Sequence, residues 1–111
     1  MERRQHARYR LWIPIEIDSE DGSSWPGVIH DVSDHGALAV TAATFKLGVN
    51  VTIRFHMPPD GSDERRHAGQ VARIGVNAAD PDSLWKKEIA INFDAPLEEL
   101  EELIRLGEKL P

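Results

Sequence analysis

The stretch VNVTIRFHM, residues 49–57, carries the strongest structural signal in the chain. Every odd-numbered residue in it is apolar and every even-numbered residue is polar. An alternation of period two is typical of a β-strand that turns one face to a core and the other to solvent. Residues 11–18 repeat the pattern, with leucine or isoleucine at each odd position. Because Pro14 has no N–H to donate, we expect that strand to have a free edge there.

Six segments are predicted to be strands when the same test is applied along the chain: 11–18, 25–32, 37–42, 49–57, 67–76 and 86–93. Turn signals separate them, and many short strands at such a spacing favour an antiparallel barrel or sandwich. The lack of long helical crossovers argues against a parallel α/β sheet. The sequence therefore predicts a mainly β fold with six antiparallel strands.

The end of the chain changes to a helical period. Its apolar residues fall on one half of a helical wheel, with glutamates opposite: Leu97, Leu100, Leu103, Ile104 and Leu110. Asp94 can cap such a helix and Pro96 suits its first turn. We expect a C-terminal helix over residues 95–111. Its apolar stripe either only covers an open mouth of the barrel or also contacts a partner.

The composition limits the class of protein. With 111 residues, 41% of them hydrophobic and 29% charged, the chain has room for one compact domain. It contains no cysteine, which excludes disulfides and thiolate metal sites. There is neither an apolar run of the roughly 20 residues that a membrane span needs nor a signal-peptide pattern. We therefore expect a cytoplasmic protein without membrane insertion.

Catalytic motifs are lacking. The five histidines are scattered, and no metal-binding pair, phosphate loop or dinucleotide fingerprint occurs. His30, Asp31 and Ser33 superficially resemble a catalytic triad, but neighbours in one strand point in alternating directions and cannot align for catalysis. We expect a non-enzymatic protein with no catalytic residue, no bound metal and no cofactor.

Charge is distributed unevenly. The net charge is −6, yet residues 1–10 hold four arginines and one glutamate, a local charge of +3. Polynucleotide binding normally uses a broad basic face, which an acidic chain does not offer. A concentrated cationic segment suits a small anion better than a nucleic-acid polymer.

Two short motifs remain as candidate binding sites. The first is Arg4-Gln5-His6-Ala7-Arg8, preceded by Arg3. A guanidinium group is a planar fork that can pair with two phosphate oxygens or with the O6 and N7 edge of guanine. Two such groups four residues apart could close on one anion. The alternative is an ordinary disordered basic tail.

The second constellation is Asp31-Val32-Ser33-Asp34-His35-Gly36. In a strand, residues i and i+2 share a face, so Asp31 and Ser33 are expected to project together while Val32 points inward. Gly36 would allow a positive φ in the turn that follows. A carboxylate beside a hydroxyl could read the edge of a guanine. The alternative is a turn whose side chains bond their own backbone.

Together, Arg-x-x-x-Arg and, 23 residues later, Asp-x-Ser-x-x-Gly resemble the PilZ domain family, over nearly the whole chain. The resemblance implies a six-stranded split barrel with a C-terminal helix that binds the bacterial second messenger cyclic di-GMP. It divides a single PilZ domain, 1–111, into an Arg-rich clamp segment 1–10, a barrel 11–94 and a helix 95–111. By position, Arg4 and Arg8 would form the clamp, and Asp31, Ser33 and Gly36 the guanine-facing edge. Arg3 is similar to family variants that take two stacked ligand molecules.

Other residues have two interpretations each. Arg73 is either a further ligand contact, by stacking or on phosphate, or a solvated strand arginine. Trp85 is expected to pack in the core or to contact the ligand. Trp12 and Trp25 are assigned to packing, or to an interaction surface if they are exposed.

Two functions follow from these features. The first is a cyclic di-GMP receptor that passes its signal to a separate, unidentified protein. The second is a PilZ-like adaptor that acts through protein contacts without the ligand. The intact arginine and Asp/Ser/Gly motifs favour the receptor.

Overall fold

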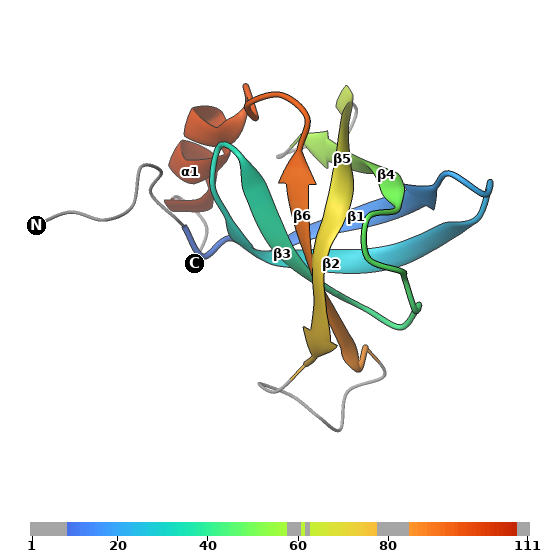
Figure 1. The fold of residues 1–111 in the computed structure, drawn as a ribbon. Helices are drawn as coiled ribbons and strands as arrows, with labels where there is room; N and C mark the ends of the chain where they lie inside the picture. The colour runs from blue at the N-terminus through green and yellow to red at the C-terminus, as the bar shows by residue number, and fades with distance from the viewer. Residues whose placement is uncertain (1–8, 58–60, 62, 78–84, 109–111) are drawn as a thin grey trace, which may run out of the picture.

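The computed structural model describes residues 9–57, 61, 63–77 and 85–108, with the side chains of 106–108 left aside. Six strands and one helix make up this part of the chain (Figure 1): β1 (Ile13–Ser19), β2 (Ser24–Val32), β3 (Gly36–Thr41), β4 (Asn50–Met57), β5 (Asp63–Val76), β6 (Lys87–Phe93) and α1 (Leu100–Glu108). Every strand pair is antiparallel, and the order β1-β2-β3-β6-β5-β4 closes a barrel. The predicted fold class is confirmed.

The period-two pattern places the core as predicted. The odd-numbered residues of β4 from 51 to 57 are each at most 4% exposed, and Ile15 and Ile17 of β1 are buried as well. The core continues into the C-terminal segment, because Leu97 and Leu103 join the same buried cluster. β1 pairs with β4 only from Glu16 onward, which leaves the β4-facing side of Pro14 outside the ladder, as its missing N–H suggested.

Two elements, β5 and α1, begin well away from the predicted residues, whereas the other strands begin within two residues of them. β5 starts at Asp63, not at 67, because residues 63–66 pair with the end of β4 although they are all charged. α1 starts at Leu100, not at 95. The preceding segment is held away from helical geometry, since Leu97 donates its N–H to the carbonyl of Asp34 and Asp94 donates to that of Ala68. Asp94 is therefore bonded to β5 and does not cap the helix.

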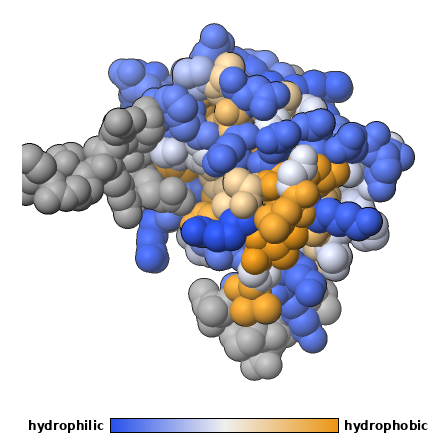
Figure 2. Space-filling view, viewed as in Figure 1, coloured by the Kyte–Doolittle hydropathy of each residue, from blue (hydrophilic) through white to orange (hydrophobic). Residues whose placement is uncertain are grey.

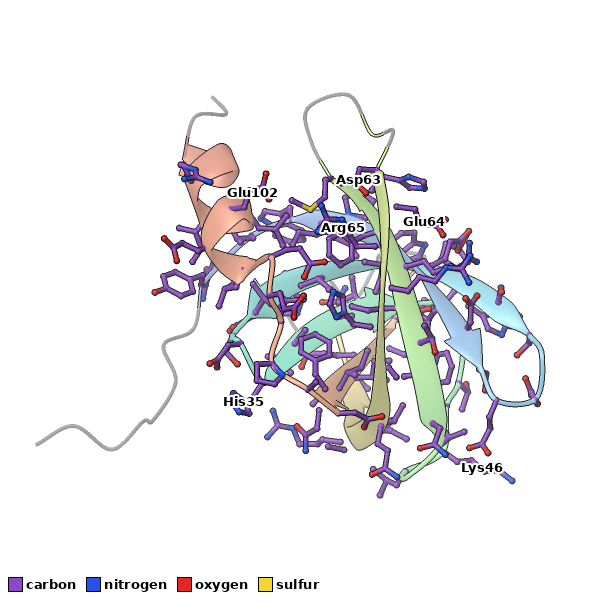
Figure 3. All side chains as sticks on the ribbon, turned by 90° about the horizontal axis from the view of Figure 1, so that it is seen from above. His35, Lys46, Asp63, Glu64, Arg65 and Glu102 are labelled. Carbon is purple, nitrogen blue, oxygen red and sulfur yellow. The ribbon has the colours of Figure 1, made fainter. Side chains whose placement is uncertain are left out.

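A buried ionic cluster fixes the segment that leads into α1. Glu99 is only 6% exposed, and its Oε2 accepts hydrogen bonds from Arg65 Nη1 (3.2 Å) and His67 Nε2 (3.0 Å). Figure 3 shows Arg65 on the part of the β4–β5 hairpin that lies toward α1. The imidazole of His67 stacks on Phe55, at 5.9 Å between ring centroids, and lies against Phe93. Charged groups this deep are stable only when they are paired.

The pKa of Glu99 reflects that pairing. Burial by itself raises the pKa of a carboxyl, but the hydrogen bond and charge of His67, helped by Arg65, outweigh burial. The pKa is therefore lowered from its ordinary value of 4.5. Its second oxygen, Oε1, lies 2.9 Å from His67 Nε2 but accepts no hydrogen bond, so the pairing is incomplete.

Close strand contacts require glycine at two places in the β3–β6–β5 sheet. A Cβ on Gly69 would lie 2.4 Å from the carbonyl oxygen of Asn92, and one on Gly36 would lie 2.7 Å from that of Ile91. Gly75, farther along β5, has no atom within 4 Å of the corresponding point. β5 thus contains one glycine, Gly69, that close packing requires, and another, Gly75, that it does not require.

We predict opposite results for alanine at these two β5 positions. Gly69→Ala should lower the free energy of unfolding by about 1–3 kcal/mol, because backbone must move to admit the methyl group. Gly75→Ala should leave it unchanged or raise it by up to about 1 kcal/mol, since neither glycine has a positive φ and the second site is open. Urea unfolding of both variants checks the pair, and equal losses would contradict the packing argument.

Glu99 predicts acid sensitivity. A carboxyl whose pKa is lower in the folded than in the unfolded state adds stability above about pH 4.5, and this is lost as pH falls through the folded-state pKa. Glu99→Gln should cost about 1–3 kcal/mol at pH 7 and should flatten the loss of stability between neutral and acid pH. The exposed Glu101→Gln is the control. Urea titrations at several pH values decide, and identical pH profiles for wild type and Glu99→Gln would refute the assignment.

Candidate functional site

The turn between β2 and β3 is braced from three sides. Within it, Ser33 donates its N–H to the carbonyl of Gly36 at 2.8 Å. Phe93, at the end of β6, donates its N–H to the carbonyl of His35 at 2.8 Å. Leu97 donates to Asp34 at 2.7 Å. These backbone bonds make the turn a fixed rim on the barrel.

Ser33 does not lie where the sequence placed it. Its side chain is buried, at 5% exposed, and is not projected beside Asp31. The hydroxyl accepts the N–H of His35 at 3.3 Å and is 3.4 Å from the carbonyl of Gly36. The alternative interpretation, a side chain that bonds its own turn, therefore describes Ser33.

The expected reason for Gly36 is also wrong. Positive φ occurs at Gly22, Gly48 and Gly61 among the described glycines, and not at Gly36. Glycine is needed there because β3 approaches β6 so closely that a side chain would meet the Ile91 carbonyl. This glycine thus sets the spacing of two strands at the rim.

A β-bulge in β2 sets the direction of Asp31. The pairing with β3 steps from Ile29–Ala39 to Asp31–Leu38, so His30 is the extra residue. Ile29 and Val32 both point into the core, and His30 and Asp31 share the outer face between them. Asp31 is half-buried there.

A second bulge, in β5, does the same for Arg73. The pairing with β6 steps from Val71–Ile91 to Arg73–Ala90, with Ala72 as the extra residue. Without the bulge, strict alternation after the buried Val71 would turn Arg73 inward. With it, Ala72 and Arg73 are both exposed, and Ile74 turns toward the core.

The two bulges place Asp31 and Arg73 on the same row of paired residues across the sheet. Asp31 pairs with Leu38, Leu38 with Ala90, and Ala90 with Arg73. Three strand spacings separate the two charged ends, which is about 14 Å. An anionic side chain and a cationic side chain therefore face outward at the two ends of one row.

A shallow hollow of about 260 Å³ lies over part of this row. Its lining is shared by β3, β5 and β6: Gly36, Ala37, Leu38, Ala72, Arg73, Ala90, Ile91 and Asn92. Small residues predominate, so the floor is low and flat, with Arg73 and Asn92 as its polar groups. Such a surface can accept a planar ring with a donor or an anion at its side. The structure thus brings Gly36 and Arg73 together and puts Asp31 at the end of the same row.

The N-terminal segment is fastened beside the rim. Tyr9 and Val32 exchange two backbone hydrogen bonds, N–H to carbonyl in both directions, each of 2.8 Å. Val32 lies between Asp31 and Ser33 in the chain. Whatever precedes Tyr9 is therefore attached at the strand end that carries the Asp-x-Ser motif.

Arg3, Arg4 and Arg8 lie outside the described residues, so their predicted contacts remain predictions. Chain connectivity still limits how far Arg8 can be from β2, because consecutive Cα atoms are about 3.8 Å apart and Tyr9 is bonded to Val32 of β2. In the described part of the chain, no group of three metal-ligating side chains gathers. No helix there is long and apolar enough to cross a bilayer.

Comparison with known families identifies this architecture. A family model for the PilZ domain matches residues 2–107. The chain belongs to the PilZ domain family. A comparison with curated proteins finds no match.

Solved structures resemble this PilZ domain in fold. The Bacillus subtilis inhibitor of motility, MotI/DgrA, superposes with a TM-score of 0.70 at 18% identity, over 98% of this chain and 51% of its own. The PilZ domain of YcgR from Escherichia coli, solved with c-di-GMP, gives 0.65 at 15% identity, over 96% and 87%. The PilZ domain of CeSA from a cellulose-synthesizing bacterium gives 0.60 at 25% identity, over 92% and 95%. The chain thus spans about half the length of MotI/DgrA.

The sequence did not single out three residues of this region. Tyr9 ties the N-terminal segment to β2, Asn92 lines the hollow, and Glu99 holds the segment that braces the turn. A sequence signal existed for Glu99 alone. Arg65 and His67 occupy alternate, inward positions of β5, and two basic residues facing a core require a buried acid.

Proposed function

We propose that this PilZ domain is a non-enzymatic cytoplasmic receptor for cyclic di-GMP. The dinucleotide would bind between the arm that carries Arg4 and Arg8 and the surface that carries Asp31 and Arg73. The Tyr9–Val32 bridge is the observation that carries the proposal, because it attaches the arginine-rich arm next to the Asp-x-Ser motif. The YcgR PilZ domain and MrkH from K. pneumonia, which share the fold, were both solved with c-di-GMP, and this supports the same ligand.

The chemistry of the residues matches such a ligand. Cyclic di-GMP is a small dianion with two guanines, so it needs a few cations and purine-edge partners. Arg4 and Arg8 supply forked donors for phosphate oxygens or for guanine O6 and N7. Asp31 can accept from the N1–H and N2–H₂ of a guanine. Arg73, beside a flat alanine floor, can add a stacking or phosphate contact.

The motif residues then have different roles. Asp31 contacts the ligand, whereas Ser33 and Gly36 act through the backbone by fixing the turn and the strand spacing. Arg3 extends the arm and could serve a second stacked ligand molecule. When the arm closes over the ligand, the exposed surface changes, and a separate downstream protein reads the change.

A ligand-independent adaptor is the second candidate, and one observation favours it. Trp12 is 75% exposed and Trp25 is 44% exposed, so neither belongs to the core and each, at its own end of the β1–β2 pair, can contribute to a protein contact. Trp85, by contrast, is half-buried. An adaptor would bind its partner equally well with and without cyclic di-GMP.

Calorimetric titration with cyclic di-GMP tests the receptor. Wild type should bind, and Arg8→Ala should bind at least about tenfold more weakly, because a charge-assisted forked contact is worth at least about 1.4 kcal/mol. The matched control is Arg66→Ala. Arg66 is an exposed β5 arginine that pairs with Glu64 at 2.9 Å and does not line the hollow.

Equal affinity of wild type and Arg8→Ala would reject the clamp. Failure of wild type to bind the dinucleotide at all would reject the receptor and leave the adaptor. An equal loss in Arg66→Ala would show that the effect is general electrostatic attraction and not a site.

A further inference from the structure

Trp12 presents an open aromatic ring just before β1. Among the large apolar side chains of the described residues it is the most exposed, at 75%. Because Ile13 packs against the core and Pro14 is exposed, strand alternation turns Trp12 to the outer face of the barrel. Its ring centroid lies 5.9 Å from that of His30, with the two planes tilted by 39°. The indole thus has a neighbour on one side and leaves most of its surface to solvent.

The neighbouring ring of His30 is itself held in place. His30 is the extra residue of the β2 bulge and shares the outer face with Asp31. Its Nε2 lies 2.8 Å from Oε2 of Glu88 on β6. The two side chains meet above β3, where Val40 pairs with Glu88 and is only 8% exposed although it lies outside the core cluster. His30 therefore gives Trp12 a fixed neighbour.

Trp12 lies beside the motif residue Asp31, on the side away from the hollow. Ile13 pairs with Ile29, so the same register brings Trp12 opposite His30. Neighbouring strands are about 4.8 Å apart, and the indole is therefore one strand spacing from β2. The hollow begins on the other side of β2, at β3. Asp31 is thus flanked by a shallow hollow on one side and by an aromatic ring on the other.

The hollow has room for one planar group. Its volume is about 260 Å³, and its lining comes from β3, β5 and β6, with no residue of β1 or β2. Figure 2 shows apolar surface in the middle of the face that carries β5, with hydrophilic surface above it and to its right. Cyclic di-GMP has two guanines on separate sugars. A second guanine therefore needs a surface of its own.

We propose that Trp12 is that surface: a stacking platform for one guanine of the bound dinucleotide, across Asp31 from Arg73. This inference rests on the proposed function and adds a residue to its site. Every base has a π face, so stacking on an indole supplies affinity without selecting the base. The carboxylate of Asp31 would then read the guanine edge. The Tyr9–Val32 bridge lies three residues before Trp12, so the arm and the platform belong to the same end of β2.

Calorimetric titration of tryptophan variants with cyclic di-GMP tests the platform. Trp12→Ala should bind at least about fivefold more weakly than wild type, because it removes one base–aromatic stack. Trp12→Phe should keep most of the affinity, since it retains an aromatic face. Trp25→Ala is the matched control and should bind as wild type does. Trp25 is also an exposed indole on the β1–β2 pair, but it lies opposite Ile17 beside the β1–β2 turn.

A direct contact measurement keeps the test valid if Trp12→Ala fails to fold. Nuclear Overhauser effects should link a guanine H8 to the indole protons of Trp12 in the wild-type complex, with the indole signals assigned by their loss in Trp12→Phe. Equal affinity of wild type and Trp12→Ala would overturn the platform and leave the receptor intact. Weaker binding without that contact would show that the ring acts through the arm, and would also overturn the platform. A wild type that binds no dinucleotide would overturn both the receptor and the platform.

Discussion

Two backbone hydrogen bonds between Tyr9 and Val32 are the constraint on which the account of the site depends. They fix the end of the N-terminal segment to β2 at the residue between Asp31 and Ser33. Without them, the arginine motif and the Asp-x-Ser motif would be joined only by the covalent chain. With them, the chain leaves the barrel toward Arg8 beside the Asp-x-Ser motif, which shortens the loop that a contact between the two motifs would have to close.

The rim is rigid because several parts of the fold meet there. β6 and the segment before α1 each bond the β2–β3 turn, and that segment is in turn held by the buried carboxylate of Glu99. The two β-bulges then direct Asp31 and Arg73 onto one outer row of the sheet. In the proposed receptor, this pre-organisation would hold Asp31 and Arg73 in place before the ligand arrives, which lowers the cost of binding.

Much of the fold could be predicted because alternation in strands such as 11–18 and 49–57 reports directly which residues face the core. The site was less predictable. A bulge shifts the phase of a strand by one residue, and no residue type marks His30 or Ala72 as the extra residue. The start of β5 was missed because residues 63–66 are all charged, and Arg65 faces inward where the pattern requires an apolar residue. The role of Gly36 depends on a strand that is distant in sequence.

Paramagnetic broadening from the arm measures the central claim most directly. The chain has no cysteine, so Gln5→Cys provides a unique attachment point for a spin label between the two motif arginines. Addition of cyclic di-GMP should broaden the amide signal of Arg73, at the far end of the row from Asp31, and leave the β1–β2 turn, residues 20–23, sharp. Ligand binding that leaves the broadening unchanged, or that moves it to the β1–β2 turn, would contradict the account.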